Sequence, residues 1–202
     1  MTIQVRIIIY TMKSFTEISS IDYQKSNFQE IEQEIESAGK DYLLRVEQEE
    51  YAEYLFNQYY KEPVTVSFED EIIEEPIVHK EKITDRFLGE QYLADVYYIT
   101  VKYPYRGSSI IFRLRPNSFT LTSGEITITD SFVSFVIKVI DKDPDEFLRR
   151  KNEVRNNSFR NLQSANSDII SYNAQLKSFI NSTIQRFKDK YLKGIVRSKS
   201  DI

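Results

Sequence analysis

The chain of 202 residues is long enough to enclose one substantial hydrophobic core, and its 41% hydrophobic and 29% charged residues are ordinary for a globular protein. The absence of cysteine excludes disulfides, thiolate metal sites and a cysteine nucleophile, and it fits the reducing cytoplasm, where we expect the protein. The net charge of −4 conceals an uneven distribution along the chain, and no apolar window reaches the roughly 18 residues of a membrane span, so we expect none.

An amphipathic helix, or a pair of helices, is predicted between residues 28 and 62. Glutamates on one side of this segment alternate with an apolar stripe on the other, which is the pattern of a half-buried helix. Gly39 indicates a break between two helices, because glycine costs roughly 1 kcal/mol inside one. Pro63 ends the segment. The stripe comprises Phe28, Ile31, Ile35, Ala38 and Tyr42 and, more loosely, Val46, Tyr51, Leu55 and Tyr59.

Beyond residue 63 the apolar period changes to two, which predicts a central antiparallel sheet of four to six strands. The alternating positions lie at 64–68, 97–103, 126–128 and 133–139. Ser123-Gly124 predicts a hairpin turn between strands at 119–122 and 125–129. The polar stretch 74–91 is interpreted as a long loop or a ragged edge strand.

The C-terminal part is predicted to be a long helix or an angled pair of helices. Asp143 and Pro144 have the character of an N-cap and a first helical residue, and an apolar stripe runs from residue 162 to 191. Asn173 is a candidate cap for a second helix, and Gly194 is a candidate C-terminal stop. The fold class is therefore α+β, with a helix and sheet core at 1–142 and a helical segment at 143–202. That segment packs on the core, as one single domain, or on a second protomer.

Charge is divided unevenly between these two parts. Residues 149–202 carry 12 Lys and Arg against 4 Asp and Glu, so that of the totals of 27 and 31 the first 148 residues keep 15 and 27. The basic part could form a face for nucleic acid. We favour the alternative, in which acidic and basic parts attract each other within the fold or across a homo-oligomer, because Asn, Ser and Gln dilute the basic stretch.

The sequence contains no residue pattern that predicts catalysis. The single histidine, His79, has no nucleophile in its neighbourhood and is expected in an exposed loop. The acidic residues at 69–71, 74 and 75, with Asp95, could bind Mg²⁺ as in a metal-dependent nuclease, but a solvated edge is favoured. Gly107 and Gly124 are isolated, so no phosphate-binding loop is predicted. We expect no enzyme, no cofactor and no metal.

Three arginines between residues 106 and 115 alternate with aromatic residues, a spacing used by platforms that stack single-stranded nucleic acid. We favour the alternative, in which the aromatics are core and the arginine stems cover the rim of the sheet. Either way the basic groups are candidates for binding a partner. The candidate binding residues are Arg106, Arg113, Arg115, Arg149, Arg150 and Arg155.

Three segments carry a resemblance to a known family. The first runs from Tyr54-Leu55 to Pro63, the second comprises Tyr103-Pro104-Tyr105-Arg106-Gly107 and residues 112–121, and the third comprises residues 169–192. Over residues 54–193 their order and spacing resemble an uncharacterised bacterial family in which this region precedes a restriction-endonuclease-like domain. The resemblance implies a role in bacterial defence against foreign DNA, as a piece of such a protein or a stand-alone version. Ser108 stands where the family carries an acidic residue, and the resemblance transfers no catalytic residue.

We therefore expect a non-catalytic sensing or assembly module of an anti-phage defence system that acts through protein–protein contacts. Its expected partners are another protein of the same operon, such as a nuclease, and further copies of itself. The alternative is a nucleic-acid-binding accessory domain that uses a basic helix and the arginine and aromatic rim. A metal-dependent nuclease is the least favoured hypothesis.

Overall fold

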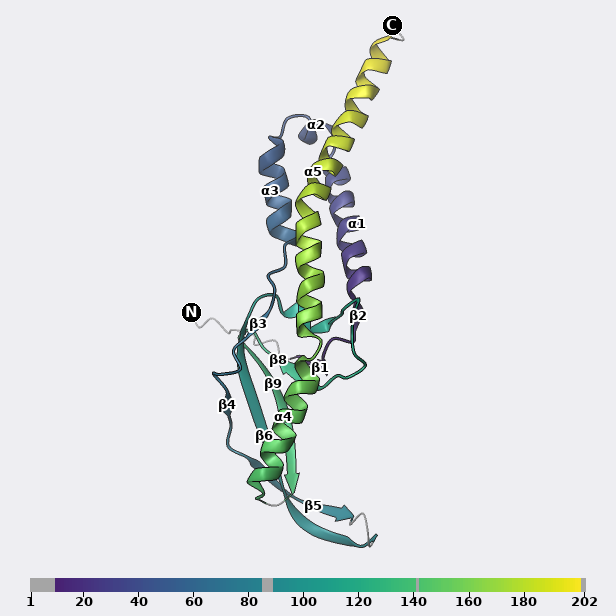
Figure 1. Cartoon of the computed structure of the whole chain (residues 1–202). Helices are drawn as coiled ribbons and strands as arrows, with labels where there is room; N and C mark the ends of the chain where they lie inside the picture. Colours follow the sequence, from purple (N-terminus) through teal and green to yellow (C-terminus); the bar gives the residue numbers. More distant parts are fainter. Residues whose placement is uncertain (1–9, 85–88, 141, 201–202) are drawn as a thin grey trace, which may run out of the picture.

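A sheet and a helical bundle lie end to end along one pair of consecutive helices, so that the molecule is elongated (Figure 1). This computed structural model describes residues 10–84, 89–140 and 142–200. The α+β class, with an antiparallel sheet and a long, bent C-terminal helical segment, is confirmed. Among the residues described, no helix combines the length and apolar character that a membrane crossing requires.

The main sheet has seven strands in the described part of the chain, joined by antiparallel pairings. Its order is β1 (Tyr10–Lys13), β8 (Glu125–Ile128), β9 (Phe132–Ile140) and β6 (Gln91–Arg106). The other edge of β6 pairs in turn with β3 (Thr65–Val66), β4 (Ile72–Ile73) and β5 (Ile77–Thr84). The long strand β6 therefore organises the whole sheet.

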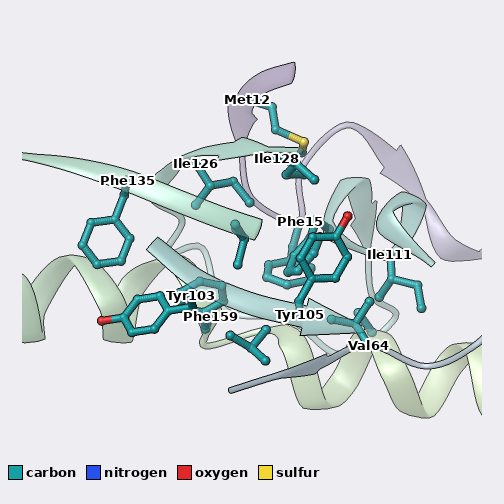
Figure 2. Close-up of a cluster of buried hydrophobic side chains, with 14 of the residues drawn as sticks. Met12, Phe15, Val64, Tyr103, Tyr105, Ile111, Ile126, Ile128, Phe135 and Phe159 are labelled. Carbon is teal, nitrogen blue, oxygen red and sulfur yellow. The ribbon is translucent and has the colours of Figure 1, made fainter. Parts of the chain in front are cut away.

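Over most of the sheet one face is buried and the other faces solvent, although Ala94 and Val96 of β6 are buried on the second face. In β9, Phe135, Ile137 and Val139 are buried, whereas Val136 and Lys138 between them are exposed. Helix α4 (Pro144–Phe159) packs on the buried side, to which it adds Phe159. This alternation is typical of an antiparallel sheet with one covered face. Figure 2 shows the buried side chains that β6, β8, β9 and the connecting segments contribute to this core.

The second core lies in the helical bundle. Helices α1 (Ser20–Ala38), α2 (Lys40–Leu43) and α3 (Gln48–Tyr59) pack against α5 (Leu162–Ser200). Gly39, at a φ of 80°, ends α1 and precedes α2, which confirms the predicted break between helices. The buried stripe of α5 consists of Tyr172, Leu176, Ile180, Ile184 and Phe187. The basic helix and the acidic helices thus share one core, and pairs such as Arg186–Glu32, at 2.7 Å, join them.

A compact junction connects the sheet and the bundle. The 3₁₀ helix η1 (Ser109–Arg113) leads into β7 (Leu114–Arg115), which pairs in parallel with β2 (Ile18–Ser19) just before α1. Side chains of η1 and β7 are fully buried, among them Ile111, Phe112 and Leu114. The segment 103–121 is therefore the joint between the two parts.

The predicted hairpin around Ser123-Gly124 is wrong. Residues 119–124 form no strand, because Asn161 binds the backbone of Thr120 through both its amide oxygen and its amide nitrogen. Gly124 packs so closely on α4 that a Cβ atom there would lie 2.0 Å from Ser158 Oγ. The hairpin is made instead by β8 and β9, which residues 129–131 connect.

For the stretch 74–91 the edge-strand alternative is confirmed over residues 77–84, where pairing with β6 stabilises the strand despite its polar sequence; residues 85–88 lie outside the described part. Two further predictions about local structure are wrong. Asn173 caps no helix, because its side chain binds the backbone of Lys61 and α5 continues past it. The bend falls at residues 160–161. Gly194 does not end α5, since a cost of about 1 kcal/mol is too small to stop a helix of 39 residues.

Candidate protein-interaction surface

The three arginines of the predicted rim lie in different environments. Arg113 donates from Nε to Glu17 at 2.8 Å, and its guanidinium lies 5.3 Å from the centre of the Tyr10 ring. Burial disfavours the charged form of Glu17, but hydrogen bonds from Tyr10 and Arg113 outweigh it and hold the pKa below its usual value. Arg113 is therefore engaged in tying η1 to the segment after β1.

Arg115 and Arg106 do not join that cluster. The guanidinium of Arg115 lies 5.7 Å from the centre of the Phe119 ring, at the joint. Arg106 is exposed at the end of β6, where it pairs with Thr65 of β3. Tyr103, Tyr105 and Phe112 are core residues, as the favoured alternative expected. Arg113 and Arg115, however, place their guanidinium groups, and not their stems, over exposed rings. The three arginine side chains present no common fork for an anion.

The candidate arginines of α4 also lie in different environments, and two of them form ion pairs within their own helix. Arg149 and Arg150 both bind Glu146 one turn earlier, and Arg149 Nη2 lies 2.9 Å from Glu146 Oε1. Hydrogen bonds from Arg150 and Arg149 lower the pKa of the Glu146 carboxyl. These contacts between residues three and four apart stabilise a surface helix and leave both arginines exposed to solvent.

Arg155 lines a larger hollow in the surface than the one of about 240 Å³ beside Arg113. The hollow has a volume of about 710 Å³ and lies at the bend between α4 and α5. It is lined by Phe68, Arg155, Asn156, Phe159 and Arg160. The guanidinium of Arg155 lies 5.9 Å from the centre of the Phe68 ring. Sequence reasoning missed Arg160 and Phe68, because residues 68 and 160 meet only through the fold.

Glutamates of the acidic stretch 69–75 form ion pairs that stabilise the fold. Glu71 binds Lys151 of α4 at 2.6 Å and accepts a hydrogen bond from the Tyr103 hydroxyl, also at 2.6 Å. Burial opposes charge on Glu71, yet the bonds from Lys151 and Tyr103 hold its pKa below the usual value. Glu74 forms an ion pair with Lys102 of β6. Within residues 10–84, 89–140 and 142–200, no three His, Asp or Glu side chains converge to hold a metal ion.

Exposed apolar side chains concentrate on β4, β5 and residues 91–98 of β6, which we call the ribbon. Its tip extends past the start of α4 (Figure 1). Two of its side chains are among the most exposed apolar groups described, Leu93 at 67% and Ile77 at 62%. The other members are Ile72, Ile73, Val78 and Tyr92. The sequence signal was the pairs 72–73 and 77–78, which stand among charged residues and do not alternate.

A polar cluster fixes the ribbon on the solvent-facing side of the sheet. Glu81 of β5 accepts hydrogen bonds from the Tyr98 hydroxyl and from Lys138 Nζ of β9, the latter at 2.6 Å. These bonds from Lys138 and Tyr98 lower the pKa of Glu81. His79 is exposed, as expected, but lies in strand β5 with its ring edge-on to Tyr98 at 5.5 Å. The cluster holds β5 in place and leaves its outer edge open.

The outer edge of β5 carries no further strand in the described part of the chain. Every residue from Ile77 to Thr84 pairs with β6 on the inner side. An apolar pocket of about 240 Å³ lies at the base of the ribbon, between Pro76, Tyr97, Ile99 and Phe147. An unpaired edge next to exposed apolar side chains is a surface that can bind another chain.

Comparison with protein-family models, with curated proteins and with solved structures finds no match for this chain. The resemblance of residues 54–193 to a bacterial family therefore stays a prediction. The segments that carry it are largely internal, since Tyr103, Phe112 and Tyr172 are buried. A shared pattern there would report a shared fold at the joint more than a shared ligand.

Proposed function

We propose that this protein is a non-catalytic assembly module that binds another protein through the ribbon. The observation that carries the proposal is the concentration of exposed apolar side chains on β4, β5 and β6, away from both cores. Apolar groups gathered on one element mark interaction sites more often than chance exposure does. Leu93 and Ile77 are each about two thirds exposed, so burying them would contribute about 1–2 kcal/mol each, before the loss of freedom on binding.

Strand addition is the binding mode that fits this surface. An extended segment of a partner can hydrogen-bond the backbone of β5, while the alternate side chains of β5 supply specificity. The Glu81 cluster holds the edge in one conformation before binding, which reduces the entropy lost on association. The arginines of the predicted rim have no part in this mode.

The biological setting that we propose is bacterial defence against foreign DNA in the cytoplasm. This part of the proposal is supported by the family resemblance of residues 54–193. The expected partner is a protein of the same operon, such as a nuclease, which the module would help to assemble or to hold in check.

Co-purification with the products of neighbouring genes tests the proposal. The wild-type chain should retain a partner through size-exclusion chromatography, and Leu93→Lys should lose it. Leu121→Lys is the matched control, because Leu121 is even more exposed, at 94%, but lies at the joint. Both variants should unfold at the wild-type urea midpoint, since exposed substitutions shift stability by about 0.5 kcal/mol or less. Retention of the partner by Leu93→Lys would contradict the proposal.

The hollow at the bend between α4 and α5 supports a second function, nucleic-acid binding. Arg155, Arg160 and the Phe68 ring combine cationic and aromatic groups of the kind that hold single strands. The exposed Glu69 and Asp70 beside Phe68 disfavour a polyanion there, which is why we rank this function second. Fluorescence anisotropy with a single-stranded oligonucleotide should show binding that weakens between about 50 and 200 mM salt and weakens further in Arg160→Glu. An anisotropy signal that does not change with salt concentration would exclude nucleic-acid binding at this hollow.

A further inference from the structure

We infer that the outer edge of β5 pairs with β5 of a second copy of this chain, antiparallel, with Lys80 on the two-fold axis. The inference rests on the proposed use of the ribbon for assembly and deepens it: the strand added at this edge is β5 of a second copy, in place of a segment of another protein. It is carried by the order of side chains along β5, which is self-complementary in a single register. A symmetric dimer joined in this way would continue the sheet through both copies.

Symmetry restricts the registers that are available. Residues directly opposite each other in an antiparallel pair lie on the same face of the sheet, and neighbours along a strand lie on opposite faces. A two-fold axis perpendicular to the sheet keeps each residue on its face in both copies. One residue of β5 must therefore lie opposite the same residue of the second copy. The candidates near the middle of the strand are His79, Lys80 and Glu81.

The register centred on Lys80 matches side chains on the solvent-facing side. There Ile77 of each copy meets Ile83 of the other, and His79 meets Glu81. Two apolar pairs therefore flank two pairs that can hydrogen-bond, and each such pair stabilises an antiparallel sheet by about 0.2–1 kcal/mol. Ile77 is the most exposed apolar side chain of β5, at 62%, and the pairing would cover it.

The opposite side tolerates the same register. Val78 meets the stem of Lys82, whose methylene groups can cover it. Lys80 meets Lys80 of the second copy, but Asp95 lies directly opposite Lys80 within each chain. The row across the axis therefore runs Asp95, Lys80, Lys80, Asp95, so the two lysines adjoin each other and each also has an acid on its other side.

The neighbouring registers are worse. Centring on Glu81 places this carboxylate opposite its copy and sets Lys80 opposite Lys82 twice, so that every charged pair repels. Centring on His79 places the highly exposed Ile77 opposite Glu81 and brings Pro76, which has no N–H, opposite Lys82. The sequence of β5 thus selects Lys80 as the axis.

The oligomeric state of the full chain is the first test. Sedimentation equilibrium or light scattering over a wide micromolar range should show a monomer–dimer equilibrium. A chain that stays monomeric at the highest concentration overturns the inference. If that monomer still retains a partner from its operon, the proposed function stands and only the self-pairing fails; a dimer without such a partner gives the reverse result.

The lack of cysteine permits a direct test of register. In Lys80→Cys the two Cα atoms would lie roughly 4.5–5.5 Å apart, within the range of a disulfide. Lys82→Cys is the matched control on the same face, where the two positions are offset by roughly 13 Å along the strands. Mild oxidation should link Lys80→Cys into dimers and leave Lys82→Cys monomeric on non-reducing gels. Equal linkage of the two variants, or none in Lys80→Cys, overturns the register.

A charge pair separates loss of pairing from loss of folding. Ile77→Lys should raise the dimer dissociation constant roughly fivefold or more, since two apolar pairs become mismatched. Adding Ile83→Glu should lower it again, because each introduced lysine then faces an introduced glutamate of the other copy. Failure of the double variant to recover dimerisation, with unfolding midpoints unchanged, contradicts the pairing of these two positions.

Discussion

Asn166 of α5 binds Val64 by both backbone polar groups: its amide oxygen accepts the Val64 N–H at 2.8 Å, and its amide nitrogen donates to the Val64 C=O at 2.7 Å. Asn173 binds Lys61 in the same way, at 3.3 and 2.7 Å. Seven residues of helix rise about 10.5 Å, and three residues of extended chain span about 10 Å. The distance between Asn166 and Asn173 along the helix therefore matches the distance between Val64 and Lys61 along the extended chain. Helix α5 thus acts as a template for residues 61–64, which lead into the sheet.

Asn166→Ala should lower the free energy of unfolding by about 2–3 kcal/mol. Val64 is buried, so both of its backbone groups would lose their partner without gaining water. Urea unfolding followed by circular dichroism measures the change. Asn181→Ala is the control, because Asn181 bonds only to Lys177 of its own helix, and it should change stability by about 0.5 kcal/mol or less. Equal effects of the two variants would contradict the template role.

Gly107→Ala should destabilise the joint by about 3 kcal/mol. Gly107 has a φ of 102°, and a Cβ atom there would lie 2.3 Å from the carbonyl oxygen of Pro63. Gly89→Ala separates the two causes, since Gly89 has a φ of 69° and, in the described part of the chain, no atom beyond its chain neighbours lies within 4 Å of the added Cβ. It should cost only the left-handed conformation, about 1–2 kcal/mol. Thermal unfolding of the two variants decides whether the contact with Pro63 or the backbone angle dominates.

Local signals were readable from the sequence, and contacts between distant segments were not. The N-cap Asp143, the break at Gly39 and the apolar stripe of α5 depend on neighbours within a few residues, so the pattern predicts them correctly. The pairing of Arg113 with Glu17 and the conformation of Gly107 against Pro63 depend on residues far apart in the chain. The same limit applies to β5, whose polar sequence becomes a strand because β6 pairs with it.

Asp143→Ala should lower stability by about 1 kcal/mol. The Asp143 carboxylate accepts the N–H groups of Asp145 and Glu146 at 3.0 and 3.1 Å, which are unpaired donors at the start of α4. Asp143→Ser keeps an acceptor at the cap and should recover most of the loss. Urea midpoints of the two variants measure the difference. A loss in Asp143→Ser as large as that in Asp143→Ala would assign the effect to charge and not to capping.

Glu71 should make stability depend on pH in the acidic range. Its pKa in the folded protein is lowered, so its contribution is fully present above the carboxyl pKa of the unfolded chain, about 4.3, and is lost as pH falls through the folded value. Glu71→Gln removes the charge that Lys151 and Tyr103 stabilise. The gap in unfolding free energy between wild type and Glu71→Gln should therefore be widest near neutral pH and narrow below about pH 4. Glu69→Gln, at an exposed neighbour, is the control and should change stability by about 0.5 kcal/mol or less. A gap for Glu71→Gln that does not change with pH would mean that packing, and not the ion pair with Lys151, holds the segment before β4 against α4.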